Sequence, residues 1–176
     1  GREPLDVLYD FLLEGEGTAM GALMGSNDIA ERQEVLREML VHPDTVTGLS
    51  DAGAHVTLIC DATMPTTQLT YWVRDRQRGE RLPLEFIVAK QTANNARLYG
   101  FHDRGLLAPG KRADINVIDL ERLTVAPPKA HHDLPAGGTR LIQPVHGYLA
   151  TMVKGEVTRR HDADTGARPG TLVRST

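Results

Sequence analysis

The segment of the chain best suited to chemistry lies at residues 48–55 and has the sequence GLSDAGAH. Its aspartate, Asp51, follows a short apolar run at 46–50 that is typical of a buried strand, and the small residues after it allow a sharp turn. A carboxylate at the end of a barrel strand lies where α/β barrels build their active sites. Beside a metal-bound water, such a carboxylate can take up a proton and return it to a leaving amine. Because aspartate is also a common turn residue, the spacing alone leaves a purely structural role open.

His55 is the second candidate, because it comes four residues after Asp51 and can face the same cleft as a substrate-binding residue. The remaining histidines are scattered among polar turns and are expected to be solvated rather than metal-bound. They are His42, His102, His131, His132, His146 and His161. Cys60 has no recognisable His or Asp partner, which favours a small buried residue over a nucleophile.

One further charged stretch contains four arginines in eight positions, and it is expected to be a solvated helix face and loop. Its members are Arg74, Arg76, Arg78 and Arg81. One of these guanidinium groups could bind a substrate carboxylate, because guanidinium and carboxylate match in charge and geometry.

The elements that must position these residues fall into two parts. Helical spacing of apolar residues predicts helices over 4–13, from Ser26 or Asn27 to about 40, over 67–76 and over 83–100. The later sequence predicts a strand and turn at 106–111, a strand at 114–119 and a β-hairpin formed by 148–153 and 156–159. A Pro/Gly-rich stretch at 126–138 is expected to be a loop. The first hundred residues therefore indicate α/β structure, and the rest a small antiparallel β module.

The composition excludes several classes of partner. The 176 residues include 20 basic and 23 acidic side chains, spread along the chain, for a net charge of −3. This balance argues against nucleic acid and membrane surfaces, since both favour a basic face. No apolar run approaches the roughly 20 residues that a membrane-spanning helix needs. With Cys60 as the single cysteine, no intrachain disulfide can form, and a cytoplasmic protein is expected.

Four segments of the chain resemble one protein family. SDAGAH at 50–55 is similar to the SD(G/A)GAH signature of the D-aminoacylase branch of the amidohydrolase superfamily. Residues 92–119 resemble the superfamily's passage from its last barrel helix into a β-sandwich, and VKGEV at 153–157 resembles its closing hairpin. TGARPG at 165–170 looks like the tail of the N-acyl-D-amino-acid deacylases. The first and last of these motifs are the narrower ones, and together they favour the D-aminoacylase branch.

The resemblance implies a fold and a reaction. The fold would be the C-terminal part of a TIM-like (β/α)8 barrel, of α/β class, followed by a small β-sandwich module. Residues 1–104 would supply the last strand and helices of the barrel, and residues 105–176 the β module. In that family, Asp51 would deprotonate a zinc-bound water and protonate the departing amino group of an N-acyl-D-amino acid.

The chain departs from the family in its metal ligands. The family's metal-binding half supplies an early His-x-His pair, a bridging Cys or carboxylated Lys and two later histidines, and no His-x-His occurs here. His131 and His132 are adjacent, so they cannot reproduce that alternating geometry on a strand. The first residue is Gly1, not Met, and this favours a piece of a longer protein. Zinc is therefore expected in the parent enzyme and not in this chain.

Two other interpretations stay open from the sequence. The chain could be a non-catalytic association module derived from the same fold, which the missing metal ligands favour. It could also belong to a cyclic-amide hydrolase similar to the dihydropyrimidinases. Because a partial barrel leaves strand edges and an apolar face open, self-association of the chain is expected in either case.

Overall fold

The computed structural model describes residues 1–17, 19, 33–48 and 50–174 and divides the chain into two compact units, Gly1–Pro43 and Asp44–Thr176. The first unit contains α1 (Pro4–Gly17) and α2 (Gln33–Val41). The backbone of α1 leaves helical geometry at Glu14, whose ψ is 148°, and Gly15 follows with a φ of +59°. The predicted helix over 4–13 is confirmed. The second helix is confirmed over its later part, and its predicted start at Ser26 or Asn27 lies outside the described residues.

The apolar side chains of α1 are exposed. Leu5 is 78% exposed, Tyr9 65% and Leu13 55%. In a soluble domain these side chains would normally face a core, because the apolar stripe of an amphipathic helix is stable only when it is buried. The described part of this unit therefore presents an unusually apolar helix surface.

The helical part of the second unit begins with a run of three continuous helical segments. These are η2 (Asp61–Thr63), α3 (Met64–Thr67) and η3 (Gln68–Asp75). Pro65 lies in the first turn of α3, where its missing N–H removes no helical hydrogen bond. The helix predicted over 67–76 is confirmed and begins several residues earlier. Its buried face carries Leu69 and Trp72, which are 5% and 7% exposed.

The helix predicted from 83 to 100 is broken in two. It consists of α4 (Leu84–Gln91) and α5 (Ala93–Leu98), and the break is at Thr92, whose φ and ψ are −122° and −83°. The Thr92 hydroxyl donates to the carbonyl of Val88 at 2.6 Å. A threonine that bonds back to the preceding turn competes with the helical backbone and bends it, which accounts for the break.

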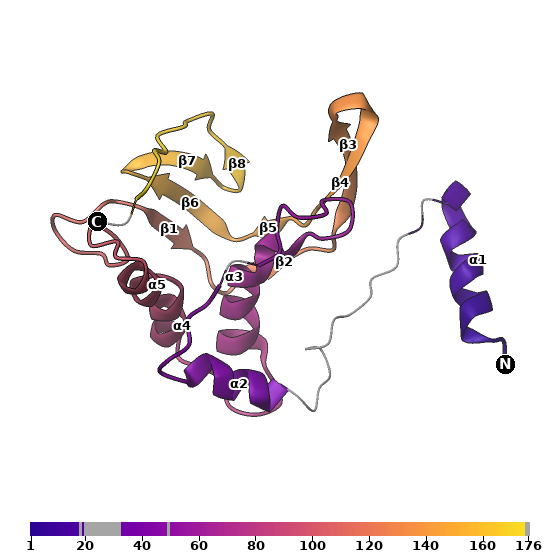
Figure 1. Cartoon of the computed structure of the whole chain (residues 1–176), viewed down its shortest axis with the longest axis horizontal. Coiled ribbons are helices and arrows are strands. Elements are labelled where there is room, and N and C mark those ends of the chain that lie inside the picture. The colour runs from indigo at the N-terminus through magenta and orange to yellow at the C-terminus, as the bar shows by residue number, and fades with distance from the viewer. Residues whose placement is uncertain (18, 20–32, 49, 175–176) are drawn as a thin grey trace. The chain divides into compact units, whose positions relative to one another are not determined.

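Four strands form one antiparallel sheet, and Figure 1 shows them side by side. In the order of the sheet they are β1 (Ile115–Ile118), β6 (Tyr148–Val153), β7 (Glu156–Arg160) and β8 (Ala163–Asp164). The predicted strand at 114–119 and the predicted hairpin are confirmed. Lys154 and Gly155 connect β6 to β7 with φ values of +56° and +81°. Two successive residues with positive φ are typical of the tight turn that matches the twist of a hairpin.

Two smaller antiparallel pairs complete the β structure. Thr124–Val125 (β2) pairs with Val145–His146 (β5), and Lys129–Leu134 (β3) pairs with Gly138–Ile142 (β4). The β3–β4 hairpin extends away from the four-stranded sheet (Figure 1) and turns through η4 (Pro135–Gly137). The prediction of a loop over 126–138 is therefore wrong. Conversely, residues 106–111 contain no strand.

The fold has the expected mixture of helices and strands, with one correction at the site. The strand predicted at 46–50 is absent: residues 46–48 and 50 are irregular, and Val46 is 42% exposed. All strand pairs among the described residues are antiparallel. A parallel strand is stable only between partners in a covered sheet, and the described residues offer none beside this run. The described structure is thus a mixed α and β fold with antiparallel sheets, while the barrel and the sandwich stay predictions.

Helices and strands of the second unit share one small core. Ile87 of α4 and Leu123, just before β2, are both fully buried. Arg74 of η3 ties the two kinds of element together, because its guanidinium donates to the carbonyls of Leu120, Glu121 (3.0 Å) and Leu123 (2.9 Å). Residues on both sides of the boundary predicted between 104 and 105 belong to the same compact unit, and the division into a barrel part and a β module stays a prediction. None of the helices in the described ranges is long and apolar enough to cross a membrane.

We expect Gly147→Ala to destabilise the second unit by roughly 2 kcal/mol or more, because it combines strain with a clash. The φ of Gly147 is +110°, and an added Cβ would lie 2.7 Å from the Cα of Leu123. Gly110 is the matched control: its φ is +81°, but nothing lies within 4 Å of an added Cβ. Gly110→Ala should cost only about 1 kcal/mol. Urea unfolding of both variants tests this, and equal losses would contradict the close approach at Leu123.

Candidate functional site

Asp51 and His55 lie on an irregular segment, residues 50–60, which we call the Asp51 loop. Both residues are exposed. The loop folds back on itself through backbone hydrogen bonds: the amide of Ala54 donates to the Asp51 carbonyl at 3.2 Å, and that of Leu58 to the His55 carbonyl at 2.7 Å. Gly53 has a φ of +92° and His55 a φ of +46°. Positive φ is uncommon for a residue with a side chain, so the His55 backbone is held by this turn.

The structure brings Asp51 and His55 into one turn but not into a closed cleft. No hydrogen bond or ion pair with another described residue involves either side chain. Two small hollows in the described structure are lined by other residues. The predicted strand before Asp51 is wrong, because residues 46–48 and 50 are irregular, whereas a cleft at Asp51 stays a prediction. What the loop does offer is an exposed carboxylate and, four residues later, an exposed imidazole.

Both sides of the Asp51 loop are anchored to the rest of the second unit. On the later side, the carbonyl of Val56 accepts a hydrogen bond from the amide of Leu141 in β4 at 2.8 Å. On the earlier side, the carbonyl of Thr47 accepts one from the Asn95 amide group of α5 at 3.0 Å. The loop is thus held between a helix and a strand that are distant from it in sequence.

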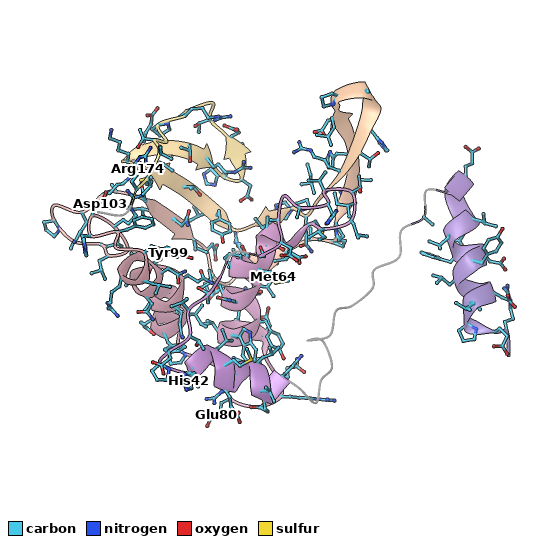
Figure 2. The ribbon with its side chains drawn as sticks, viewed as in Figure 1. His42, Met64, Glu80, Tyr99, Asp103 and Arg174 are labelled. Carbon is cyan, nitrogen blue, oxygen red and sulfur yellow. The ribbon has the colours of Figure 1, made fainter. Side chains whose placement is uncertain are left out.

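The residues at the end of the loop are structural. Burial, reinforced by the neighbouring Asp61 carboxylate, raises the pKa of the Cys60 thiol. A raised pKa leaves little thiolate near neutral pH, which disfavours Cys60 as a nucleophile, and the side chain is part-buried. Thr63 is buried and its hydroxyl donates to Gln143 at 2.5 Å. Met64, labelled in Figure 2, follows at the start of α3 and is 46% exposed.

The residues in the described ranges do not fit a catalytic zinc ion. They contain no group of three or more His, Cys, Asp or Glu side chains that could hold a metal, whereas a catalytic zinc site uses about three protein ligands. The six histidines expected to be solvated are all exposed. His132 bonds to the hydroxyl of Thr139 at 2.8 Å, and His146 lies 3.4 Å from an Asp162 oxygen.

Two of the four arginines expected on a solvated face have structural roles instead. Arg76 is 2% exposed and its guanidinium lies 4.4 Å from the centre of the Trp72 ring. Arg74 binds the backbone carbonyls described above and also the carboxylate of Asp75. Stacking on an aromatic ring and binding of several carbonyls at once are contacts that suit the planar guanidinium. Neither contact can be predicted from sequence spacing, because the partners come from tertiary packing.

One of the two small hollows lies after the end of α5, between residues 100–104 and 171–174, and has a volume of about 360 Å³. Figure 2 labels Asp103 and Arg174 on this side of the unit. Its two central arginines are already neutralised: Arg104 pairs with Asp103 at 2.8 Å, and Arg112 pairs with Asp114 at 2.9 Å. Two of the three arginines that line the hollow are therefore already paired with carboxylates.

The TGARPG tail forms a local ion pair. Arg168 donates to both carboxylate oxygens of Asp164 at 2.8 and 2.9 Å, and the amide of Gly166 donates to the same carboxylate at 2.7 Å. These bonds stabilise the charged form and lower the pKa of Asp164 to about 2. The motif thus fastens the tail to β8 and takes no part in the geometry of the Asp51 loop.

Comparison with known proteins places the chain in a family. A model of the Amidohydrolase family matches residues 6–159, which is most of the 176 residues. The chain therefore belongs to the amidohydrolase family, a family of hydrolases. Searches of curated proteins and of solved structures gave no significant match. The match extends from α1 to the end of β7, so helices and β module belong to the same family region.

We expect the purified 176-residue chain to bind no stoichiometric zinc. Asp51 and His55 together supply at most two ligands, and the described histidines do not gather around them. Elemental analysis after dialysis against zinc-free buffer should give well below one zinc per chain. About one tightly bound zinc per chain would show that the chain holds a ligand set absent from the described residues.

We expect Cys60 to react slowly with iodoacetamide at pH 8 compared with a free cysteine peptide. Its raised pKa reduces the thiolate fraction, and its partial burial limits access. The rate should rise as the pH increases toward the raised pKa. Mass spectrometry of timed samples measures this, and a rate at or above that of the peptide would indicate an activated thiol.

Proposed function

We propose that this chain is the C-terminal part of a zinc-dependent amidohydrolase that cleaves the amide bond of N-acyl-D-amino acids. Membership of the amidohydrolase family supports a hydrolase. The similarity of residues 50–55 and 165–170 to motifs of the D-aminoacylase branch supports the substrate class. The observation that carries the proposal is the exposed Asp51 carboxylate, which makes no bond to another described side chain.

The proposed role of Asp51 is that of a proton carrier. In amide hydrolysis, water loses one proton as its oxygen attacks the carbonyl carbon, and the amine nitrogen gains one as the C–N bond breaks. A carboxylate that accepts the first proton and donates it in the second step balances the reaction, which yields a carboxylic acid product and an amine. A residue with this role must be ionised and reachable by substrate, and an uncommitted surface carboxylate meets the second requirement.

His55 is proposed to contact the substrate. It lies in the same turn as Asp51, and its backbone is held in a conformation that is unusual for a residue with a side chain. An imidazole at that place can donate a hydrogen bond to a carboxylate such as that of an amino acid. The zinc ligands are proposed to lie in another part of the complete enzyme, because the described residues do not fit the ion.

A second candidate function is association, and the exposed apolar surface of α1 favours it. An amphipathic helix with Leu5, Tyr9 and Leu13 largely exposed would gain stability by burial against a partner. Self-association of the isolated chain through α1 is compatible with a hydrolase. A surface that is exposed in the isolated chain need not be exposed in the complete enzyme. A cyclic-amide hydrolase is the nearest alternative in substrate, and a substrate panel separates it from the main proposal.

In the complete enzyme, we expect Asp51→Asn to lower kcat by about 10² or more, the range for loss of general acid/base catalysis. Its zinc content should stay nearly unchanged, because Asp51 is not proposed to be a ligand. The assay measures amine release from a panel of N-acyl-D-amino acids and cyclic amides, with and without zinc. Unchanged turnover would remove Asp51 from the mechanism.

Asp61→Asn is the matched control, because it makes the same chemical change at the residue that directly follows the same loop. It should keep most of the activity. The isolated 176-residue chain should hydrolyse none of the substrates. Turnover by the isolated chain would contradict the proposal that the activity belongs to the complete enzyme.

A further inference from the structure

The backbone just before the Asp51 loop is bound by side chains of two helices. Lys90, in the last turn of α4, donates from its ammonium group to the carbonyl of Thr45 and to the Thr45 hydroxyl at 2.9 Å. Asn95 of α5 donates to the carbonyl of Thr47 at 3.0 Å and to its hydroxyl at 3.2 Å. The Thr47 hydroxyl in turn donates to the carbonyl of Lys90 at 3.1 Å. Five hydrogen bonds thus join residues 45 and 47 to the two helices.

These bonds replace the ladder of a strand. The run is irregular, so its carbonyls have no neighbouring strand to bind, and a buried carbonyl without a partner is costly. Thr45 and Thr47 both contact these helices, Thr45 through Lys90 and Thr47 through Lys90 and Asn95. Lys90 is only 3% exposed, and a buried ammonium group is tolerated where oxygen atoms surround it. The bonding is therefore specific to this pair of helices and this run.

The break at Thr92 contributes to this arrangement. Lys90 and Asn95 lie on opposite sides of the break, one in α4 and the other in α5. Because each helix has its own direction, the two side chains can bind carbonyls two residues apart along the run. A straight helix would present positions 90 and 95 about 140° apart around its axis, since each residue turns it by roughly 100°.

We propose that Lys90 and Asn95 are positioning residues that hold Asp51 in place through Thr45 and Thr47. The inference rests on the proposed role of Asp51 as the proton carrier. Asp51 comes four residues after Thr47, and the later side of its loop is fixed independently by the bond from Leu141 to Val56. Proton transfer requires hydrogen-bond reach, and a displacement of about 1 Å can cost up to about 10² in rate. The anchoring of residues 45 and 47 therefore determines whether the Asp51 carboxylate stays within hydrogen-bond reach for proton transfer.

The test is a pair of variants at Thr47 in the complete enzyme. Thr47→Val keeps the shape and removes the hydroxyl that joins Lys90 to Asn95, whereas Thr47→Ser keeps that hydroxyl. We expect Thr47→Val to lower kcat roughly tenfold with KM within about twofold of the starting value, and Thr47→Ser to retain most of the activity. Thr158→Val is the matched control, because the Thr158 hydroxyl donates to the Thr151 carbonyl within the β module.

A double-mutant cycle with Asp51→Asn separates positioning from general stability. If Thr47 acts through Asp51, Thr47→Val should lower kcat by less than about twofold in the Asp51→Asn background. An equal loss in both backgrounds, or an equal loss in Thr158→Val, would overturn the inference. If Asp51→Asn alone left turnover unchanged, the proposed function would fail first, and that outcome is distinct from failure of the positioning role.

A second variant and a second measurement keep the test decisive if Thr47→Val folds poorly. Asn95→Ala removes two of the five bonds from a partly exposed side chain, and it should reproduce the loss in kcat. In the 176-residue chain, hydrogen–deuterium exchange should increase over residues 45–59 in Asn95→Ala and stay unchanged in Thr158→Val. Unchanged exchange over residues 45–59 would show that the helices do not hold the loop, and would overturn the inference without any activity assay.

Discussion

The structure of residues 44–176 depends on the attachment of one helix to one stretch of backbone that precedes β2. Arg74 binds the carbonyls of residues 120, 121 and 123, and Leu123 between these contacts and β2 is fully buried. A guanidinium offers five N–H donors in a fixed plane, so it can satisfy several carbonyls that have no strand partner. Trp72 and Leu69 on the same helix complete the core from the other side. Helix α4 also packs against η3, so the helical part and the segment before β2 meet at this helix.

Local sequence predicted the elements whose signals are local. The β6–β7 hairpin was predictable because Lys154 and Gly155 separate two alternating runs, and tight turns of this kind have strong residue preferences. The β3–β4 hairpin was missed because its strands are polar and its turn begins with a proline. It is stabilised by cross-strand contacts such as the ion pair between Arg140 and Asp133 at 2.7 Å. Hydrophobic periodicity in the sequence does not predict such contacts. The break at Thr92 was missed for a similar reason, since threonine also occurs within regular helices.

For the candidate site, the sequence supplied candidate residues, Asp51 and His55, but not the geometry around them. The apolar run before Asp51 has the composition of a buried strand, but a strand forms only where at least one neighbouring strand pairs with it. The composition of residues 46–50 indicates a preference for a strand, whereas the strands available to pair with them depend on the rest of the fold. In the described structure, side chains of α4 and α5 bind the run in place of strands. The role of Lys90 could therefore not be predicted from the sequence. A lysine near the end of an amphipathic helix is ordinarily solvated, and Lys90 is buried only by the tertiary structure.

The ion pair of the C-terminal tail has a consequence for how the tail can be released. The pKa of Asp164 is lowered to about 2, so its carboxylate stays ionised and paired with Arg168 at and above the pH at which ordinary carboxyl groups titrate. The ion pair weakens only as the pH falls toward about 2. Acidification to pH 4 therefore leaves the ion pair between Asp164 and Arg168 intact. Both side chains are well exposed, however, so salt weakens their attraction, since the Debye length falls to about 3 Å at 1 M ionic strength. The attachment of the tail to β8 is thus expected to depend more on ionic strength than on mild acid.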